Sequence, residues 1–531
     1  MTRSRFPLFA TLIEILSPRA RRRASLRNSW GRAGDEDGWL ASRYFDLQRE
    51  RHCVDDKTWT DLELPGLFRQ MDTTVTGVGR QYLYRLMRTY DFDVDALARR
   101  YTAYHVLGTE APLREQLQLA LTGLESDSAA YIADALFGAP PFILNRSHLL
   151  YTWALCCLIS IVAVAHFGLW PLAVTLTVNA TVLYKLSPRL RRDTETLINA
   201  RRLLAVADRL GSVGPHSAIP QLAELQAQRR KRARLRRDLR WLALSADEKS
   251  PLAGIWLAAD WLCLARVVAY DRAARRFTRS RKEWASTFEI VGYLDAAIAV
   301  ANFLQRVPIH CQPSVSDEAT LAIADGYHPL IAHPTVNSLT LEHRSALVTG
   351  SNLAGKTTFV KMVAINLILG HTLGICLASS ATLPRSGVMA LIRGDQSVVS
   401  GKSHYAAEAA AIGEFVQRAS TGECRIFIID EPFSGTNTIE RIAVVKAVLD
   451  AMSAHAQVLA TTHDVELQHM LRERFDFFYF REDPEVEGFF DFKVRTGVST
   501  ERNAIRVLQR MGFPPEIVST ALSLVGKPPV P

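Results

Sequence analysis

Apolar residues dominate one stretch of the chain, between residues 149 and 184. The run over 149–167 has about the length that a helix needs to cross a bilayer, and a second run over 172–184 follows a short turn. Basic residues flank the pair and are absent from the turn: Arg146, Lys185, Arg189, Arg191 and Arg192. By the positive-inside rule, this pattern predicts a transmembrane helical hairpin with both ends in the cytoplasm. The alternative is a buried helical hairpin in a soluble core.

Much of the remaining N-terminal part shows helical spacing. Apolar positions recur every three or four residues over 83–107 and 193–210, which predicts amphipathic helices. Residues 228–240 are intensely basic, and in a helix their charges would occupy all faces. Such a helix is either a solvated lever or a surface that contacts phosphate or lipid. The apolar run over 252–270 carries Asp260 at its centre, which favours a core helix over a third membrane pass.

The pattern changes near residue 316. Short runs rich in β-branched and aromatic residues, such as SALVTG, RIFIID, VLATTH and FFYF, alternate with helical segments from there on. This alternation is typical of a parallel sheet with helices on both faces. The sequence therefore predicts an all-α region that carries the hairpin, followed by an α/β domain.

Composition narrows the choice of partner and compartment. The chain has 531 residues, is 48% hydrophobic and carries a formal net charge of +9, which favours an acidic partner, either nucleic acid or anionic lipid. Its seven cysteines are scattered without metal-ligand spacing, so we expect reduced thiols facing a cytosol. The apolar residues 6–16 come before the densest basic cluster of the N-terminal segment, whereas a secretory signal has its basic residues first. This segment is therefore either an interfacial helix or a basic tail.

The strongest chemical motif follows the predicted strand ALVT. It matches the phosphate-loop pattern in full: Gly350, Ser351, Asn352, Leu353, Ala354, Gly355, Lys356 and Thr357. Backbone N–H groups of such a loop surround phosphates, while Lys356 would reach the β- and γ-phosphates and Thr357 would ligate Mg²⁺. Thr358 continues into the required helix, and we expect it to contact the nucleotide as well. The motif predicts binding of ATP or GTP.

Two acids and a histidine follow at strand ends. Asp430 and Glu431 end the apolar strand CRIFIID, where Asp430 would complete the Mg²⁺ site and Glu431 would polarise the attacking water. His463 ends the next strand and is a candidate sensor of the γ-phosphate. Each has a plainer explanation, a helix cap or a solvated loop for the acids and a structural role for the histidine. Ser403 opens a helix that would point at a neighbouring subunit's γ-phosphate, and it would also serve as an ordinary cap.

These residues resemble the ABC-ATPase group and, within it, the MutS family of DNA mismatch-repair ATPases. TGSNLAGKTTFVK is similar to that family's phosphate loop, VVSGKSHYAAE to its signature helix, FIIDEPFSGTNTIE to its Asp-Glu strand, and ATTHDVEL to its His motif. GYHPLI resembles the segment that leads into the ATPase domain. Outside that domain, LPGLFRQMDTTVTGVGRQYLYRLM and VGYLDAAIAVANFL resemble the start and return of the helical core. ERNAIRVLQRMGFPPEIVSTAL resembles the family's C-terminal helical pair, which supports dimerisation.

The resemblance implies a Mg²⁺-dependent ATPase that works as a homodimer. It makes Lys356, Glu431 and His463 catalytic and places Ser403 in the partner's site. The resemblance has limits. We expect neither a mismatch-reading domain before the core nor a nuclease module after the ATPase domain, and the hairpin and basic helix stand where the family has its lever and DNA clamp. The predicted parts are a basic segment, a MutS-core-like region, the transmembrane hairpin, a helical return and the ATPase domain: residues 1–55, 56–145, 146–187, 188–315 and 316–531.

The predicted protein is thus a dimeric MutS-type ATPase anchored in the inner membrane, with its ATPase domain in the cytoplasm. Nucleotide would move the helical core. Double-stranded or branched DNA near the membrane is the candidate partner, beside membrane lipid. The alternative is a membrane-associated mechanochemical or signalling ATPase that binds no DNA.

Overall fold

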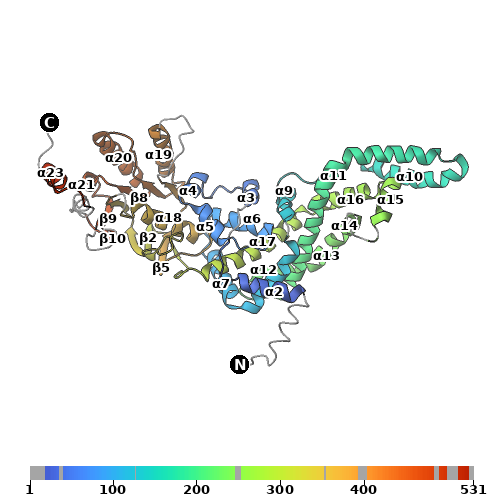
Figure 1. Ribbon diagram of the computed structural model, residues 1–531, viewed down its shortest axis with the longest axis horizontal. Helices are drawn as coiled ribbons and strands as arrows, with labels where there is room; N and C mark the ends of the chain where they lie inside the picture. The colour runs from blue at the N-terminus through green and yellow to red at the C-terminus, as the bar shows by residue number, and fades with distance from the viewer. Residues whose placement is uncertain are drawn as a thin grey trace, which may run out of the picture. The chain divides into compact units, whose positions relative to one another are not determined.

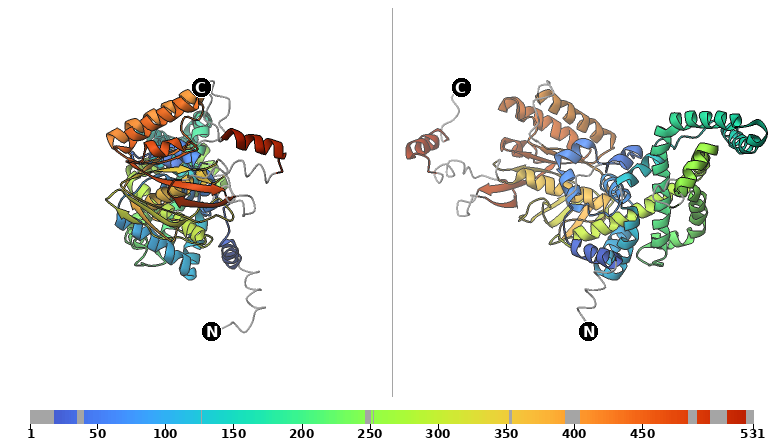
Figure 2. Two further views of the ribbon diagram at one scale, coloured as in Figure 1. Left: turned by 90° about the vertical axis from the view of Figure 1, so that its left-hand side faces the viewer. Right: turned by 45° about the vertical axis from the view of Figure 1, so that its right-hand side comes forward.

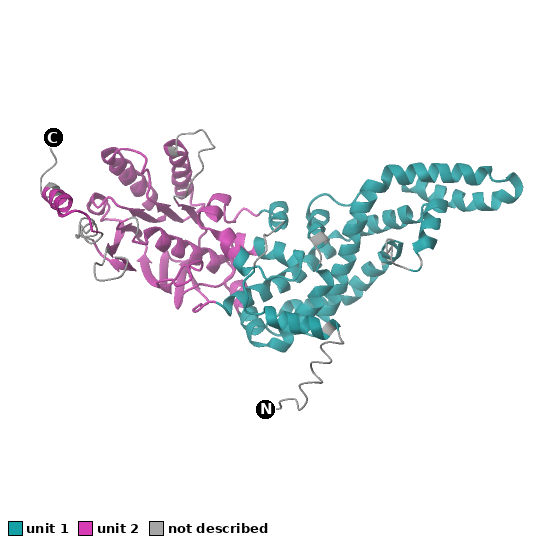
Figure 3. Cartoon of the chain, viewed as in Figure 1, with its two compact units in different colours: residues 1–49, 69–85, 102–306 teal, residues 50–68, 86–101, 307–531 magenta. Residues whose placement is uncertain are grey.

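The chain forms two compact units whose sequence segments are interleaved (Figure 3). The computed structural model describes residues 18–34, 40–125, 127–245, 251, 253–351, 354–392, 404–482, 490–498 and 512–525. One unit, here called the helical unit, comprises Met1–Arg49, Arg69–Arg85 and Thr102–Arg306. The other, here called the sheet unit, comprises Glu50–Phe68, Leu86–Tyr101 and Val307–Pro531. The sheet unit therefore includes two short segments from the N-terminal part of the chain.

In its described residues, the helical unit contains helices and no named strand (Figure 1). Its shorter helices are α2 Pro18–Ser29, α3 Arg43–Leu47, α8 Ala111–Leu121, α9 Ile132–Phe137, α12 Pro220–Ala227, α13 Arg229–Asp238 and α14 Arg240–Ser245, with the 3-10 turns η1 Thr122–Leu124 and η2 Asp127–Tyr131. The three helices that have residues in both units are α5 Leu64–Met71, α6 Gly77–Arg88 and α7 Val94–Thr109. All seven cysteines of the chain are free thiols in this structure.

Helices α10 (Ser147–Phe167) and α11 (Trp170–Gly211) form a hairpin and lie side by side (Figures 1 and 2). The predicted hairpin is therefore present as an element of the fold. Its second arm is longer than predicted, because the segments 172–184 and 193–210 belong to the single helix α11. Pro188 lies inside α11. A proline removes one backbone hydrogen bond from a helix, but α11 continues past it to Gly211.

Two described helices are long and apolar enough to cross a membrane, α10 and α17 (Arg281–Leu304). Their surroundings differ, since 94% of the apolar window of α17 is buried, against 11% of the window in α10. Helix α17 is therefore a core helix of the helical unit. Helix α10, with a mean hydropathy of 2.0, exposes an apolar surface.

The predicted single helix over 252–270 is wrong. The segment forms α15 (Ala253–Cys263) and α16 (Ala265–Arg279), which meet at an angle of 89°. Leu264 joins them with a φ of +55°, and the buried carboxylate of Asp260 accepts a 2.6 Å hydrogen bond from the N–H of Arg266. Asp260 thus satisfies an N–H group in the first turn of α16, which explains why an acid lies in an apolar run.

The predicted continuous helix over 83–107 is also interrupted. Helix α6 ends at Arg88 and α7 begins at Val94. Between them, the Asp93 carboxylate accepts hydrogen bonds from the N–H groups of Asp95 and Ala96, at 2.9 and 3.2 Å. An aspartate in this position caps a new helix, so the helical spacing of apolar residues continues across a break.

The sheet unit contains two sheets. The larger has the strand order β10-β9-β4-β8-β7-β6, with parallel pairing throughout except for the antiparallel edge strand β10. Its strands are β4 Ser345–Thr349, β6 Val388–Leu391, β7 Ile426–Asp430, β8 Gln457–Thr462, β9 Phe475–Glu482 and β10 Phe490–Thr496. The smaller sheet, ordered β1-β5-β2-β3, has the strands β1 Ser314–Ser316, β2 Thr320–Gly326, β3 Asn337–Glu342 and β5 Ser380–Pro384. The predicted α/β domain with a largely parallel sheet is confirmed.

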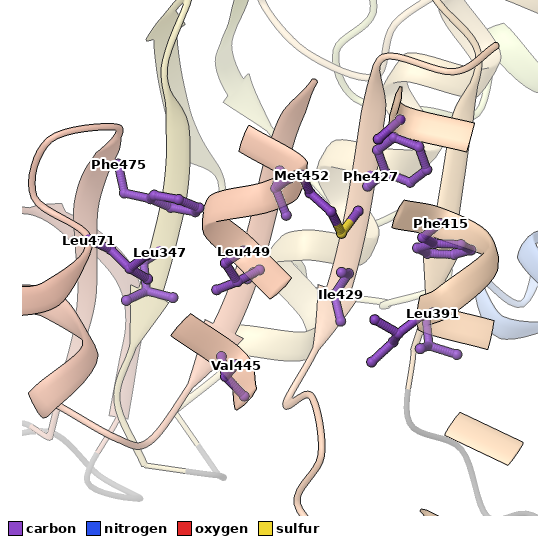
Figure 4. Packing of buried hydrophobic residues seen from close by; sticks show 14 of the residues in the cluster. Leu347, Leu391, Phe415, Phe427, Ile429, Val445, Leu449, Met452, Leu471 and Phe475 are labelled. Carbon is purple, nitrogen blue, oxygen red and sulfur yellow. The ribbon is translucent and has the colours of Figure 1, made fainter. Parts of the chain in front are cut away.

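Helices cover the larger sheet. They are α4 Asp56–Asp61, α18 Lys356–Thr372, α19 His404–Thr421, α20 Thr438–Ser453 and α21 Glu466–Met470. The last described helix of the chain is α23 Pro515–Val525. Apolar side chains of β7 pack against α19 and α20, as Phe427, Phe415 and Met452 show in Figure 4. Helix α18 contacts β8 and β7 of the larger sheet and β2 of the smaller one. Burial on both faces explains why the central strands read as continuous apolar runs.

Candidate active site

The phosphate-loop motif connects β4 to α18. Gly350 and Gly355 have φ values of +143° and +100°, conformations that favour glycine. A Cβ atom on Gly350 would lie 3.1 Å from both Cβ and O of Phe480, so the loop approaches β9 too closely for a larger residue. The predicted ligands Asn352 and Leu353 lie outside the described residues. The strand, loop and helix follow one another in the order that the motif predicts.

Lys356 lies at the first position of α18, and its side chain is only 1% exposed. Its Nζ donates hydrogen bonds to the carbonyl oxygens of Gly350 and Ser351, at 2.8 and 3.0 Å. The same Nζ lies 3.2 Å from Oε1 of Glu431. The ammonium group is therefore held between the loop and the end of β7, where the sequence expects phosphates.

Asp430 is the last residue of β7 and accepts hydrogen bonds at both carboxylate oxygens. Thr357 Oγ1 donates to Oδ2 at 2.9 Å, and Thr461 Oγ1 donates to Oδ1 at 2.6 Å. Burial raises the pKa of the Asp430 carboxyl, and the hydrogen bonds from the two threonines offset part of this effect. A hydroxyl and a carboxylate this close together offer the oxygen ligands that Mg²⁺ prefers.

The donor set fits Mg²⁺ bound together with a nucleotide. Among the described residues there is no cluster of three or more His, Cys, Asp or Glu side chains that could hold a metal. An ion at Thr357 and Asp430 would therefore take its other ligands from water and phosphate, as Mg²⁺ commonly does. Ser351 fits a phosphate, because its buried Oγ makes no hydrogen bond within the described residues. Thr358 is exposed on the first turn of α18, and Ala354 is buried in the loop.

Glu431 follows Asp430 with a φ of +47°, an unusual conformation for a residue other than glycine. Its N–H donates to Thr461 Oγ1 at 3.0 Å, so one threonine hydroxyl contacts both acids. Nδ1 of His463 lies 4.0 Å from Oε1 of Glu431, and the histidine side chain is 42% exposed. The structure thus brings together Lys356, Glu431 and His463, which come from three separate segments of the sequence.

Several contributors to the site were missed from the sequence. Thr461 lies two residues before His463 on β8, and its position in a buried strand with a polar end was the available signal. Asp464 forms a bidentate ion pair with Arg441 of α20, at 2.8 and 2.7 Å. Glu408 of α19 accepts a hydrogen bond from the N–H of Phe433, at 2.7 Å. Nothing in the local sequence reveals these last two pairs, because their members lie more than 20 residues apart.

The trans-acting residue predicted at Ser403 lies outside the described residues. Helix α19 is described from His404 onward. The side chain of Glu408 in this helix accepts a hydrogen bond from the N–H of Phe433. This bond connects α19 to the residues that follow Glu431.

Comparison with known families matches residues 346–527 to MutS domain V. That range contains all but the first residue of β4, the phosphate loop, β7 with its two acids, and His463. The chain therefore contains a domain of the MutS family over residues 346–527. The matched region holds every residue that the sequence analysis assigned to the nucleotide site.

Individual MutS proteins are also similar to this chain. The DNA mismatch repair protein MutS of Thermus aquaticus is 28% identical over 242 residues, which cover 44% of this chain and 29% of that protein. Endonuclease MutS2 of Streptococcus pyogenes serotype M18 is 28% identical over 244 residues, which cover 44% of this chain and 30% of that protein. The chain thus spans less than a third of the length of these MutS relatives.

We predict that two buried acids at this sheet edge respond oppositely to neutralisation. Because the pKa of Asp430 is raised in the folded protein, its charged form lowers the free energy of unfolding. This cost is absent at low pH, where the carboxyl group is protonated. It is fully present once the pH exceeds the raised pKa. Asp430→Asn should therefore leave the sheet unit as stable at pH 7 as the wild type, or more so. Asp464→Asn should destabilise it by about 3–5 kcal/mol, because Arg441 loses its partner.

Hydrogen exchange of peptides from β7 and β8 measures both changes in the full-length protein. Equal losses of protection in the two variants would identify Asp430 as a structural acid and contradict its assignment to a metal site.

Proposed function

We propose that this MutS-family protein hydrolyses ATP with Mg²⁺ as a homodimer and couples hydrolysis to movement of its helical unit. The observation that carries the proposal is the cluster of Lys356, Thr357, Asp430 and Glu431 at one sheet edge. Thr357 and Asp430 would hold Mg²⁺, which neutralises phosphate charge when bound. Glu431, fixed through its backbone by Thr461, would orient and deprotonate the attacking water.

His463 and Ser403 complete the proposed site. His463 lies at the open side of the cluster, where its partly exposed ring would contact the γ-phosphate. Ser403 would act from the N-terminus of α19 on the nucleotide of the partner subunit. This assignment rests on the family resemblance of the segment around Ser403, and it makes each site depend on both chains.

We further propose that the hairpin α10–α11 lies in a membrane, which would be the inner membrane, with the sheet unit in the cytoplasm. Its exposed apolar side chains include Leu155, Leu158, Ile159, Val162, Phe167, Trp170, Val174 and Tyr184. An apolar surface this continuous is unfavourable in water and favourable in lipid. Helix α15 contacts both arms and adds the exposed residues Ile255, Leu257 and Trp261. The bend at Leu264 would let α15 join the membrane segment without crossing it.

One polar residue supports this arrangement of three helices. Asn179 of α11 is fully buried, and its Oδ1 accepts a 2.9 Å hydrogen bond from Trp153 Nε1 of α10. Its Nδ2 donates to the carbonyl oxygen of Trp261 in α15, at 2.8 Å. A fully hydrogen-bonded amide at a helix interface is a common way of associating helices in lipid.

DNA is the partner that the relatives favour, since those compared above are named as a DNA mismatch repair protein and an endonuclease. The net charge of +9 agrees with a polyanionic partner. The competing function, a mechanochemical or signalling ATPase at the membrane, requires the same nucleotide site and no DNA.

The test of hydrolysis uses two substitutions. Lys356→Ala should abolish nucleotide binding, because it removes the buried ammonium group. Glu431→Gln should still bind ATP but hydrolyse it about 10²–10⁴-fold more slowly, the usual effect of losing a general base. Steady-state phosphate release and binding of a fluorescent ATP analogue separate the two effects. Hydrolysis at the wild-type rate by Glu431→Gln would remove this residue from the mechanism.

The same assay tests the dimer. Chains carrying Ser403→Ala and chains carrying Lys356→Ala should each be inactive alone. Their mixture should regain part of the activity, because one composite site of the mixed dimer contains neither change. A mixture as inactive as its parents would argue against a site shared between chains.

Membrane insertion should depend on the exposed face of α10. Replacing Leu158 and Val162 with arginine should remove the protein from the membrane fraction, since each charge at the centre of a span costs about 2.5–3.5 kcal/mol. The matched control replaces Gln226 and Ala227, both exposed on α12, with arginine and should stay in the membrane fraction. Recovery of the wild-type protein in the soluble fraction without detergent would show that the hairpin packs against protein instead.

DNA binding decides between the two functions. If the proposal holds, the purified protein should bind duplex or branched DNA at low salt, and the affinity should fall at least tenfold between about 50 and 200 mM salt, as expected for several phosphate contacts. Fluorescence anisotropy of labelled DNA measures both. Absence of binding at the lowest salt concentration would favour the ATPase that acts without DNA.

A further inference from the structure

Six arginines line one cavity of the helical unit. The cavity has a volume of about 510 Å³ and lies between α11 and the helices α13 and α14. The arginines are Arg201, Arg202, Arg209, Arg236, Arg237 and Arg240. Arg201, Arg202 and Arg209 belong to α11, where their spacing keeps them on one side of the helix. The other three belong to the basic run over 228–240, to which the sequence alone assigned no definite role.

Few of these charges are neutralised by the protein. Among the described side chains, Arg236 alone of the six has a carboxylate within ion-pair distance, Asp208, at 3.1 Å. Asp208 is shared, because it also accepts from Arg232 Nε at 3.0 Å. Arg202 donates to the neutral Asn199, and Nε of Arg201 is buried with no hydrogen-bond partner in the part of the chain that the structure describes. Among the described residues, five of the six guanidinium groups that line the cavity therefore have no carboxylate within ion-pair distance.

Arg201 shows the effect of this crowding. Its burial, and then the positive charges of Arg236 and Arg240, lower the pKa of the guanidinium group. Guanidinium groups remain charged at physiological pH, so the repulsion among them persists. An anion in the cavity would relieve it.

The prediction that the charges of residues 228–240 occupy all faces of a solvated helix is wrong in one respect. Arg232 is 2% exposed and forms the ion pair with Asp208 that fixes α13 against α11. This buried pair gives the basic helix a defined orientation. It places Arg236 and Arg237 at the cavity and leaves Arg229, Arg230 and Lys231 in solvent.

A neighbouring cavity shows that unpaired arginines are not general in this unit. That cavity, of about 1230 Å³, shares Arg209 and is also lined by arginines of α2. Those arginines are paired, Arg22 with Glu125, and Arg23 and Arg27 with Glu115. Among the described residues, the arginines that line only the larger cavity thus have carboxylate partners, whereas most of those in the smaller cavity have none.

We propose that the arginine cavity binds a soluble anion that carries two or more phosphate groups, such as a nucleoside polyphosphate or inorganic polyphosphate. Its volume lies in the range of small-molecule sites. Arginine recognises phosphate oxygens through pairs of parallel hydrogen bonds, so several arginines in a concave site match several phosphates on one molecule. The site is separate from the phosphate loop and does not depend on the proposed ATPase activity.

Distance along α11 favours a soluble ligand over a lipid headgroup. At a rise of about 1.5 Å per residue, Arg201 lies roughly 18 Å and Arg209 roughly 30 Å beyond Arg189, one of the basic residues that follow the apolar arm. A headgroup at the end of that arm would not reach both. The concave shape also disfavours a duplex, whose phosphates lie on a convex surface.

The test measures binding of inorganic tripolyphosphate by calorimetry to the full-length protein in detergent. All variants carry Lys356→Ala, so that the phosphate loop does not contribute. The cavity variant replaces Arg201, Arg237 and Arg240 with glutamine. The matched control replaces Arg229, Arg230 and Lys231 with glutamine, which removes the same charge from the exposed part of α13. We expect the Kd to rise at least tenfold in the cavity variant and less than twofold in the control.

A second measurement protects the test against misfolding. Tripolyphosphate should raise the unfolding temperature of the Lys356→Ala protein and of the control, but not of the cavity variant. Without ligand, the cavity variant should unfold at the same temperature as the control or above it, because repulsion has been removed. A cavity variant that unfolds at a lower temperature would mean that the arginines stabilise the fold, and would overturn the proposal.

Three other results would also overturn it. In the first, the cavity variant and the control bind tripolyphosphate equally weakly. In the second, no protein binds tripolyphosphate, and the cavity variant loses binding to anionic vesicles. In the third, the cavity variant loses binding to duplex DNA, and tripolyphosphate does not compete with that DNA. The first would indicate general electrostatic attraction, the second a lipid site and the third a nucleic-acid surface. None of them bears on hydrolysis at the phosphate loop, so this proposal and the proposed function fail separately.

Discussion

A buried ammonium group connects the phosphate loop to the end of strand β7. Lys356 Nζ lies 3.2 Å from the carboxylate of Glu431 and donates to two loop carbonyl groups. Removing one partner of such a buried pair typically costs about 3–5 kcal/mol, because the other charge remains without compensation. The site therefore depends on this pair, and phosphate oxygens are the ligand groups that could replace its carboxylate and carbonyl contacts.

The neighbouring contacts follow from the same constraint. Thr461 donates to Asp430 and accepts from the N–H of Glu431, so β8 fixes both acids of β7. Thr357, one residue after the lysine, donates to the other oxygen of Asp430. Hydrogen bonds thus connect the phosphate loop and the start of α18 to β7 and β8. They hold the oxygen atoms of Thr357 and Asp430, the carboxylate of Glu431 and the ammonium group of Lys356 close together.

The nucleotide site was largely predictable from the sequence because its signals are local. The glycines, Lys356 and Thr357 occur in one motif, and Asp430 and Glu431 end a run of residues that are apolar because both faces of the sheet are covered. The hairpin was predictable for the same reason, since its apolar character is continuous along the chain. The resemblance of the ATPase domain to MutS followed from the order of these local motifs, and the match of residues 346–527 to MutS domain V agrees with it.

The remaining features depend on residues that are distant in sequence. Helical periodicity did not reveal the bend at Leu264, because an aspartate hydrogen bond interrupts the helix while the apolar pattern continues. Thr461 and Arg441 gained their roles through partners on other strands and helices. The assignment of Glu50–Phe68 and Leu86–Tyr101 to the sheet unit required tertiary contacts such as the hydrogen bond from the Ala390 N–H to Thr58 Oγ1, at 2.9 Å.

The most direct measurement for the central claim is a structure of the full-length protein with Mg²⁺ and a non-hydrolysable ATP analogue. The account predicts that Lys356 Nζ leaves the carbonyl groups of the loop and contacts the β- and γ-phosphates, with the metal between Thr357 Oγ1 and Asp430. It also predicts that Glu431, released from the lysine, faces the γ-phosphate through a water molecule. An analogue bound elsewhere, or a Lys356–Glu431 pair unchanged beside bound phosphates, would contradict it.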